Sequence, residues 1–353
     1  MREEKRSWRR IGAALLAGGM MLAGSSLTAA EEIQPGSEAP AAAAEQRITE
    51  AEQGTQAAEI PAPGEAAQVS LTIGKKTLTV PITAEEIDLG DLKLANTDAD
   101  YAALTAFLDQ LPALKRVDMF ETEIRRQRLE PLAKRYPQIT FGWTMIIPCV
   151  NEAHPERCPH RIRTDITAYS TLHNNRCQRH TTEELAVLRY CRNLQALDIG
   201  HNNVDDISFL YDLPHLKVLI VALNPNLEDA TPIGSLKELE YLEMFRNNIH
   251  DISCLTNCEH LVDLNLCYNR ISDLSPLCGI KSLRRLWLYN SNNYTDSMPV
   301  PQSAVDQLAE ALPDCTINTW SASTAGGWRE HPRYDTINEM FWGTEYIPFT
   351  TLE

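Results

Sequence analysis

The fold is decided by the stretch LQALDIGHNNVDDISFLYDLPH (residues 194–215), because its pattern recurs four more times along the chain. The later copies are LKVLIVALNPNLEDATPIGSLKE (216–238), LEYLEMFRNNIHDISCLTNCEH (239–260), LVDLNLCYNRISDLSPLCGIKS (261–282) and the shorter LRRLWLYNSNN (283–293). All five fit the frame L-x-x-L-x-L-x-x-N, except that Ser291 replaces the asparagine in the last copy. A fixed period of this length predicts a repeat architecture in which each copy forms one coil.

Each part of the repeated frame has a structural interpretation. The x-L-x-L part predicts a short parallel strand, since its alternate leucine-type residues can point into a shared core. The asparagine that follows should turn the chain, because its amide can both donate to and accept from buried backbone groups of neighbouring coils. An aspartate further on is placed to cap a short helical or 3₁₀ turn. These residues are Asn202, Asn224, Asn247 and Asn269, with Asp206, Asp251 and Asp273.

The repeats resemble internalin-type leucine-rich repeats, and residues 163–293 are similar to exported leucine-rich repeat proteins of Gram-positive anaerobes. The flanks RTDITAYSTLHN (163–174) and GGWREHPRYDTI (326–337) also resemble the flanks of those proteins. The resemblance implies an α/β solenoid with a curved parallel sheet on its concave face and short helices or 3₁₀ turns on its convex face. It also implies extracellular placement and binding of other molecules, with no catalytic residues. The loop CVNEAHPERCPH (149–160) departs from the family pattern.

The rest of the chain divides by composition. A basic start, a short apolar run and small residues before Glu31 are typical of a signal peptide, followed by an acidic segment too poor in apolar residues to fold. Stretches around residues 100–114, 128–137, 181–191 and 303–313 have helical spacing, and strands are expected near residues 90, 118, 140, 170 and 315. The aromatic tail should cover the apolar core at the end of the array. We therefore predict a signal peptide (1–30), an Ala/Glu/Pro linker (31–67), an irregular N-terminal cap with a cysteine-containing insertion (68–165), leucine-rich repeats (166–293) and a C-terminal cap (294–353).

The charge of the chain narrows the possible partners. The formal net charge is −16, and the first thirty residues are basic, so the remainder is more acidic still. An acidic surface repels phosphate backbones, which argues against nucleic acid as a partner. After the expected signal we find no later stretch of eighteen apolar residues, so no transmembrane span is predicted. We expect a secreted or cell-surface protein.

A ligand should bind the concave face through the residues that flank the buried leucines. Large and charged side chains concentrate there in the C-terminal coils, and exposed Tyr, Trp and Arg clusters are typical of interface hot spots. Aromatic rings at this spacing could equally stack on sugars, and a third possibility is that the C-terminal cap simply covers them. The candidate ligand-binding residues are Tyr241, Glu243, Phe245, Arg246, Tyr268, Arg270, Arg285, Trp287 and Tyr289.

The nine cysteines and the histidines are candidates for disulfides and for metal binding. Cys149 and Cys158 in the inserted loop are the best candidates for a disulfide in an exported protein. The loop and its surroundings contain zinc-type ligands, but their spacing matches no established zinc pattern, so we predict no metal and no cofactor. These ligands are His154, Cys158, His160, His173, Cys177 and His180.

Catalytic motifs for hydrolases, metalloproteases and nucleotide-binding enzymes are absent from the sequence. The function predicted from sequence is therefore a non-enzymatic scaffold that binds a protein partner through its concave face. The alternatives are a module that binds glycans or the cell wall, and a metal-dependent protein that uses the Cys/His loop.

Overall fold

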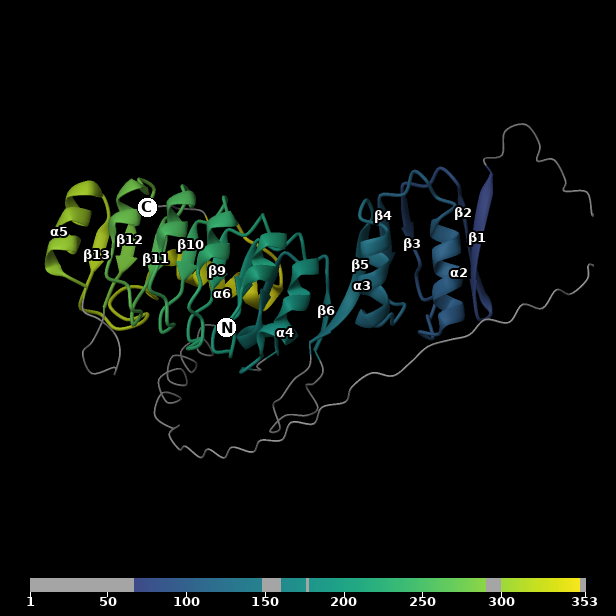
Figure 1. The fold of residues 1–353 in the computed structure, drawn as a ribbon, viewed down its shortest axis with the longest axis horizontal. Helices are drawn as coiled ribbons and strands as arrows, with labels where there is room; N and C mark the ends of the chain where they lie inside the picture. Colours follow the sequence, from purple (N-terminus) through teal and green to yellow (C-terminus); the bar gives the residue numbers. More distant parts are fainter. Residues whose placement is uncertain (1–66, 148–159, 176–177, 290–299, 350–353) are drawn as a thin grey trace, which may run out of the picture. The chain divides into compact units, whose positions relative to one another are not determined.

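The largest sheet has seven parallel strands that lie side by side in chain order, and Figure 1 shows most of them in one row. The computed structural model describes residues 67–147, 160–175, 178–289 and 300–349. Each strand is three residues long and pairs in register with the next, at the repeat positions predicted from the sequence. The strands are β7 (Ala168–Ser170), β8 (Ala196–Asp198), β9 (Val218–Ile220), β10 (Tyr241–Glu243), β11 (Asp263–Asn265), β12 (Arg285–Trp287) and β13 (Thr316–Asn318).

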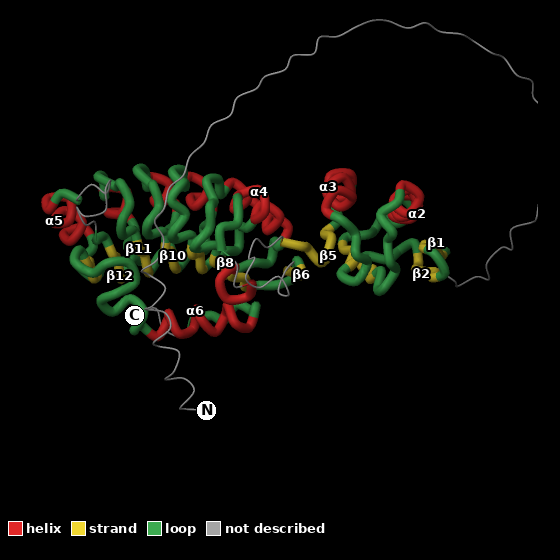
Figure 2. The backbone as a smooth tube through the Cα atoms, turned by 90° about the horizontal axis from the view of Figure 1, so that it is seen from below, coloured by secondary structure: helices red, strands yellow, loops and turns green. Residues whose placement is uncertain are grey.

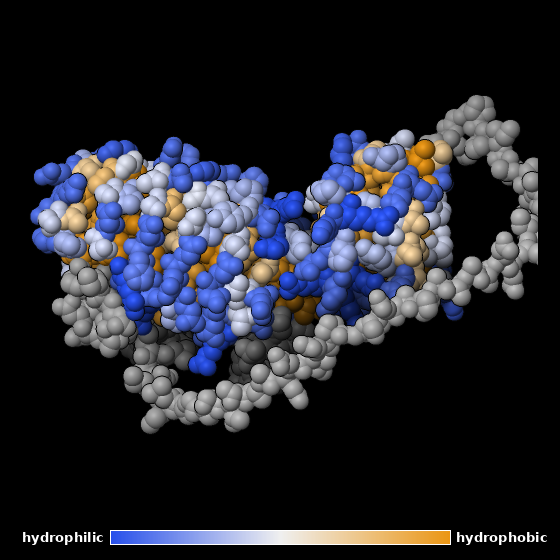
Figure 3. Space-filling model, in the orientation of Figure 1, coloured by the Kyte–Doolittle hydropathy of each residue, from blue (hydrophilic) through white to orange (hydrophobic). Residues whose placement is uncertain are grey.

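A 3₁₀ turn closes each complete coil on the side away from the strands. Leucine-type residues from strands and turns fill the space between, and Leu242 and Met244 of one coil are both 0% exposed. The predicted solenoid with one continuous core is therefore confirmed. On the face shown in Figure 3, hydrophilic residues cover most of the surface and hydrophobic residues show between them. The 3₁₀ turns are η5 (Ser208–Asp212), η6 (Thr231–Ser235), η7 (Ser253–Asn257) and η8 (Ser275–Gly279).

The repeated asparagines join successive coils as expected. The Nδ2 of Asn247 donates to the carbonyl oxygens of Val221 (3.0 Å) and Met244 (3.1 Å), and its Oδ1 accepts from the amide of Asn224 at 2.8 Å. Asn224 and Asn269 make equivalent bonds one coil away. Each side chain therefore satisfies backbone groups that the turn would otherwise leave unpaired inside the core.

Replacing Asn247 with alanine should lower the free energy of unfolding by about 1–3 kcal/mol, because it leaves buried backbone donors and acceptors without partners. The adjacent Asn248 is the matched control, since its Nδ2 reaches only the exposed Glu228 at 2.5 Å. Asn248→Ala should change stability by less than about 0.5 kcal/mol. Urea unfolding of both variants checks this, and equal effects would contradict the structural role of the asparagine ladder.

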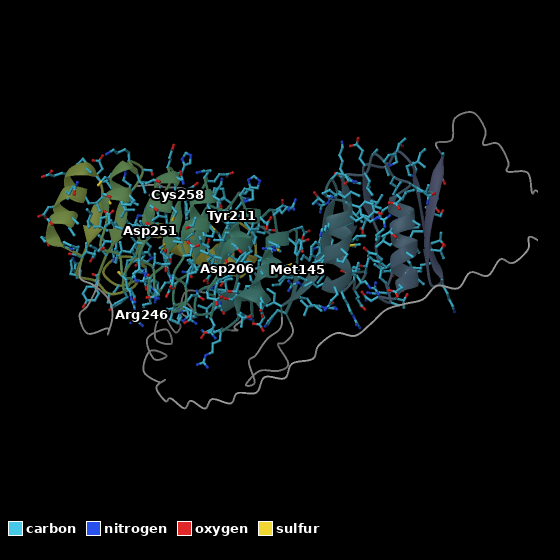
Figure 4. The ribbon with its side chains drawn as sticks, viewed as in Figure 1. Met145, Asp206, Tyr211, Arg246, Asp251 and Cys258 are labelled. Carbon is cyan, nitrogen blue, oxygen red and sulfur yellow. The ribbon has the colours of Figure 1, made fainter. Side chains whose placement is uncertain are left out.

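The predicted aspartate caps are also present. The Oδ1 atoms of Asp206 and Asp251, labelled in Figure 4, accept from the amides of Ser208 and Ser253 at 2.7 Å. Asp273 does the same for Ser275 at 2.8 Å. Each carboxylate satisfies the first free amide of a 3₁₀ turn, which explains why an aspartate recurs at this point of the frame.

A second, four-stranded sheet precedes the repeats. Its first three strands are parallel and its last is antiparallel to the third. The strands are β3 (Glu86–Asp88), β4 (Arg116–Met119), β5 (Thr140–Ile147) and β6 (His160–Arg163). The helices are α2 (Asp98–Leu108), α3 (Arg126–Arg135) and α4 (Thr182–Leu185), which continues into the 3₁₀ turn η4 (Ala186–Tyr190). A hairpin that the repeat pattern did not predict, β1 (Gln68–Ile73) with β2 (Lys76–Pro81), comes before them.

The C-terminal part departs from the expected simple end cap. Helix α5 (Gln302–Ala311) and strand β13 extend the array by one coil, as the sequence predicted. Helix α6 (Pro332–Gly343) instead lies along the sheet, on the side opposite the 3₁₀ turns (Figure 2). The C-terminal part therefore adds a last coil to the array and also covers one face of the sheet.

Some predictions lie outside the described residues. They include the signal peptide, nearly all of the linker and the Cys149–Cys158 disulfide. Within the described ranges, no helix is long and apolar enough to cross a membrane. The six cysteines described there have free thiols, namely Cys191, Cys254, Cys258, Cys267, Cys278 and Cys315.

Candidate functional site

The concave face of the solenoid is formed by the first and third residue of each strand, which point away from the leucine core. Towards β7 most of these residues are small or aliphatic, with Asp198 as the exception, and towards β12 they are aromatic, charged or amide-bearing. Ordered by strand from β8 to β12, they are Ala196 and Asp198, Val218 and Ile220, Tyr241 and Glu243, Asp263 and Asn265, and Arg285 and Trp287.

The chain's own C-terminal segment, residues 320–346, lies on this face. It runs back across the strands, from contacts with β12 near Ala325 to contacts beside β7 near Tyr346. Figure 2 shows α6 of this segment beneath the row of strands. The concave face is thus an intramolecular interface between the repeats and the C-terminal segment.

Trp328 is the main aromatic anchor of this interface. Its side chain is 0% exposed and packs against the rings of Tyr241 and Trp287, with centroid distances of 5.4 and 5.2 Å. Its Nε1 donates to Oε1 of Glu243 at 2.7 Å. The indole therefore buries its apolar surface and also satisfies its only polar group, as a well-placed buried tryptophan must.

Arg333 is the second anchor, and it binds a buried carboxylate. Its Nε and Nη2 donate to the two oxygens of Asp263 at 2.5 and 2.8 Å. Nε of Arg285 donates to the same carboxylate at 2.7 Å. Asp263 is 0% exposed, and burying its charge has a large desolvation cost. The two guanidinium groups offset this cost by pairing with the carboxylate. This triad ties β11 and β12 to the first turn of α6.

The stretch between β13 and Trp328 is held through its backbone. Nδ2 of Asn265 donates to the carbonyl of Ser323 at 2.8 Å, and Nε1 of Trp287 donates to the carbonyl of Ala325 at 2.9 Å. Backbone carbonyls are common to every polypeptide. These two side chains therefore hold the stretch by its backbone, which is a series of turns here, with φ angles of 51° at Ser323 and 67° at Gly326.

Helix α6 covers the β7 end of the face with apolar side chains. Ile337, Met340 and Phe341 are all 1% exposed or less and belong to one cluster with the small residues of β7, β8 and β9. Beyond the helix, the amide of Tyr346 donates to Oγ1 of Thr167 at 2.8 Å. Small residues at this end of the sheet leave the space that the helix fills.

The predicted ligand-binding residues are not the exposed patch that the sequence suggested. Six of the nine are between 0% and 9% exposed, because the C-terminal segment or neighbouring coils cover them, and the other three are half-buried. The buried six are Tyr241, Glu243, Phe245, Tyr268, Arg285 and Trp287; the half-buried three are Arg246, Arg270 and Tyr289. Sequence reasoning also missed Asp263, Asn265, Trp328 and Arg333 as members of the same site.

Three of the predicted residues form a separate ladder just after the strands. The guanidinium of Arg246, labelled in Figure 4, lies 4.9 Å from the ring centroid of Tyr268, which meets Tyr289 edge to face at 5.5 Å. Arg246 and Tyr268 have positive φ angles of 56° and 55°. The same left-handed position recurs in earlier coils, at His201 and Leu223. This turn directs the side chains along the rim of the face.

Burial in the interface shifts the pKa of Glu243. Burial raises the pKa of Glu243 to about 7, although hydrogen bonds from Tyr241 and Trp328 offset part of the rise. In the unfolded chain its pKa returns to 4.5. The unfolded state therefore loses this proton first as the pH rises, and stability should fall between about pH 4.5 and 7 by roughly 3 kcal/mol.

Glu243→Gln should remove this pH dependence, since the amide does not titrate. The difference in unfolding free energy between variant and wild type should shift by about 3 kcal/mol in the variant's favour between pH 4.5 and 8. Urea unfolding at both pH values measures it. A difference that is the same at both would show that Glu243 is not buried as described.

A cavity of about 70 Å³ remains between α6 and β8–β10, lined in part by His173, Asp198 and Tyr334. Ser170, His173 and Asp198 lie together here, but not as a catalytic triad. Oγ of Ser170 donates to Asp198 at 2.6 Å, and the same Nδ1 of His173 faces both Ser170 (3.1 Å) and Asp198 (3.8 Å). A triad needs the histidine to accept the serine proton on one nitrogen and the carboxylate to hold the other.

The Cys/His loop falls mostly outside the described residues, including His154, Cys158 and Cys177. Of its other members, His180 is buried, and burial lowers its pKa, while its Nδ1 lies 3.3 Å from Glu184. In the described ranges, no three His, Cys, Asp or Glu side chains are grouped to hold a metal ion.

The frame of 22 or 23 residues, the stacked parallel strands and the asparagine ladder together define the fold. The chain folds as a leucine-rich repeat solenoid. No protein-family model matches it, and no curated protein sequence does.

Solved structures do match this leucine-rich repeat chain. An internalin from Listeria monocytogenes has 18% sequence identity and a TM-score of 0.33, covering 69% of this chain and 70% of that one. Internalin C2 from the same species has 23% identity and a TM-score of 0.29, covering 58% and 80%. A leucine-rich repeat protein from Leptospira interrogans has 20% identity and a TM-score of 0.37, covering 66% and 54%. The likeness concerns the fold alone.

Proposed function

We propose that this chain is a non-enzymatic, extracellular scaffold whose concave face binds a segment of a protein partner in place of its own C-terminal segment. One observation carries the proposal, which is the way the face holds residues 320–346. It recognises backbone carbonyls through Asn265 and Trp287, and it provides separate buried sites for a tryptophan and an arginine. This is the chemistry of a polypeptide-binding surface, with anchors of the residue types that dominate interfaces.

The same observation favours protein over glycan as the ligand. The site that the C-terminal segment would vacate is shaped for an indole, since the rings of Tyr241 and Trp287 both pack against Trp328 at 5.4 and 5.2 Å. Asp263 further requires a cation, which Arg333 supplies and a neutral glycan would not. A partner would therefore present an arginine and an aromatic side chain at similar spacing.

Competition with the C-terminal segment sets the apparent affinity of the concave face for a partner. If the docked segment is favoured by about 5 kcal/mol, the face is free in less than about 0.1% of molecules, and partner binding weakens by the same factor. Variants that loosen the segment should then bind a partner more tightly. Tighter binding by these variants would show that a partner can replace the C-terminal segment. Unchanged binding would show that the segment always occupies the face.

A peptide with the sequence of residues 321–346 tests the proposal. The full chain carrying Trp328→Ala and Arg333→Ala should bind this labelled peptide, because its own segment is weakened while the face is intact. Wild type should bind it at least about tenfold more weakly, and adding Asp263→Ala to the double variant should abolish binding. Fluorescence anisotropy measures all three, and circular dichroism checks that each protein is folded. No binding by the folded double variant would contradict the proposal.

A further inference from the structure

A larger cavity, of about 670 Å³, lies apart from the concave face. Its walls come from the segment after β4, the first turn of α3, strands β5 and β6, and Val187 of η4. Buried Trp143 and Met145 are among its apolar lining residues, and Met145 is labelled in Figure 4. A volume of this size is typical of a ligand site.

The cavity is basic although the chain as a whole is acidic. Its lining holds more basic than acidic side chains, in a protein of net charge −16. Four of the basic groups are guanidinium groups, which are planar and bind carboxylates through two parallel hydrogen bonds. The basic residues are Lys93, Arg125, Arg126, Arg161 and Arg163, and the acidic ones are Glu121 and Glu123.

Three of these basic side chains already have partners. Lys93 pairs with Glu123 at 3.0 Å, Arg126 with Glu130 at 2.6 Å, and Arg163 with Asp165 at 2.7 Å. Arg125 and Arg161 are exposed, and their side chains take part in none of the hydrogen bonds or ion pairs between described residues; Arg161 lies near enough to Glu123 to help lower the pKa of that carboxyl. Two guanidinium groups therefore remain available at the cavity wall.

An exposed apolar side chain lies beside one of them. Ile146 of β5 is 53% exposed and pairs directly with Arg161 of β6 across the antiparallel ladder. Directly paired residues place their side chains on the same face of a sheet, about 5 Å apart. The cavity wall thus presents a cation and an uncovered aliphatic group together.

We propose that this cavity binds an acidic peptide segment of a partner protein. Carboxylates of the segment pair with Arg161 and Arg125, and an apolar side chain between them covers Ile146. The apolar contact favours a peptide over a sulfated glycan, since a glycan has anions but no aliphatic group to bury Ile146. Ion pairs at an exposed site are weak individually, so the apolar contact is needed to hold the segment.

A fluorescein-labelled peptide in which pairs of glutamates alternate with single leucines is the probe, added to the full chain. Binding should weaken at least tenfold on Arg161→Glu and on Arg125→Glu, and also when salt is raised from 0.05 to 0.5 M. Arg192→Glu is the matched control, because this exposed arginine is not part of the cavity wall, and it should leave binding unchanged. The same peptide with glutamine for glutamate should bind at least tenfold more weakly.

Three outcomes would overturn the proposal. Equal binding of the glutamate and glutamine peptides would show that carboxylates are not recognised. Equal weakening by Arg161→Glu and Arg192→Glu would show a general charge effect. Binding of heparin but not of the glutamate peptide would assign the cavity to a glycan. None of these outcomes depends on the concave face, so the proposed function is tested separately.

Discussion

Replacing Trp328 with alanine is expected to lower the free energy of unfolding by about 3–5 kcal/mol, the range for deleting a large buried aromatic side chain. The indole is 0% exposed and contacts Tyr241 and Trp287, so its removal leaves a cavity at the centre of the interface. It also removes the hydrogen bond to Glu243, which leaves that buried carboxyl with one fewer donor.

Trp320 provides the matched control for this prediction. It belongs to the same segment and is the same residue type, but it is 72% exposed. Trp320→Ala should change stability by less than about 0.5 kcal/mol. Urea unfolding followed by far-ultraviolet circular dichroism measures both variants. Similar losses in the two proteins would contradict the burial of Trp328 on the concave face.

Replacing Arg333 with alanine should have a comparable effect, about 3–5 kcal/mol, because it removes one partner of a fully buried carboxylate. Asp263 would keep only Arg285, which donates to Oδ1, and Oδ2 would lose the bond from Arg333. Arg329 is the control, since it is exposed four residues earlier in the same segment. Its guanidinium lies 5.8 Å from the ring centroid of Tyr334, so its replacement by alanine should cost no more than about 1 kcal/mol.

A triple variant separates the charge from the packing. Asp263→Leu with Arg285→Met and Arg333→Met removes the whole buried triad and replaces it with apolar groups of similar size. Replacing a complete buried ion pair in this way is often neutral, whereas removing one member is costly. The triple variant should therefore be more stable than Arg333→Ala alone. A triple variant that is less stable would show that the ion pairs contribute more than their desolvation costs.

The repeats could be predicted because their pattern is periodic and local. The four complete coils repeat the leucines, the asparagine and often the aspartate, so Asn247 or Asp251 could be assigned a role from its position in the frame alone. The structure confirms these roles with named hydrogen bonds. The helical stretches before the repeats and after them were predicted for the same reason.

The path of the C-terminal segment could not be predicted in this way. It depends on contacts between residues far apart in the sequence, such as the 70 positions between Asp263 and Arg333. An aromatic tail that closes an end coil and one that crosses the sheet have the same composition. One signal was available, since acidic and aromatic side chains in the strands are complementary to Trp328 and Arg333 in the tail. A large aromatic face also needs a cover of some kind.

The hairpin of β1 and β2, by contrast, could have been predicted from its local sequence. Its signal is local, because alternating apolar residues flank the two-residue connection that begins at Gly74, whose φ is +62°. Such a connection between alternating stretches indicates a hairpin. The repeat frame did not extend to these residues, so it gave no information about them.

Amide hydrogen exchange of residues 332–343 in the full chain tests the central claim most directly. An isolated helix of twelve residues is marginal in water, so protection of α6 must come from docking on the concave face. We expect its amides to exchange at least about a hundredfold more slowly than those of a free peptide of the same sequence. Exchange at the rate of the free peptide would show that the C-terminal segment does not occupy the face.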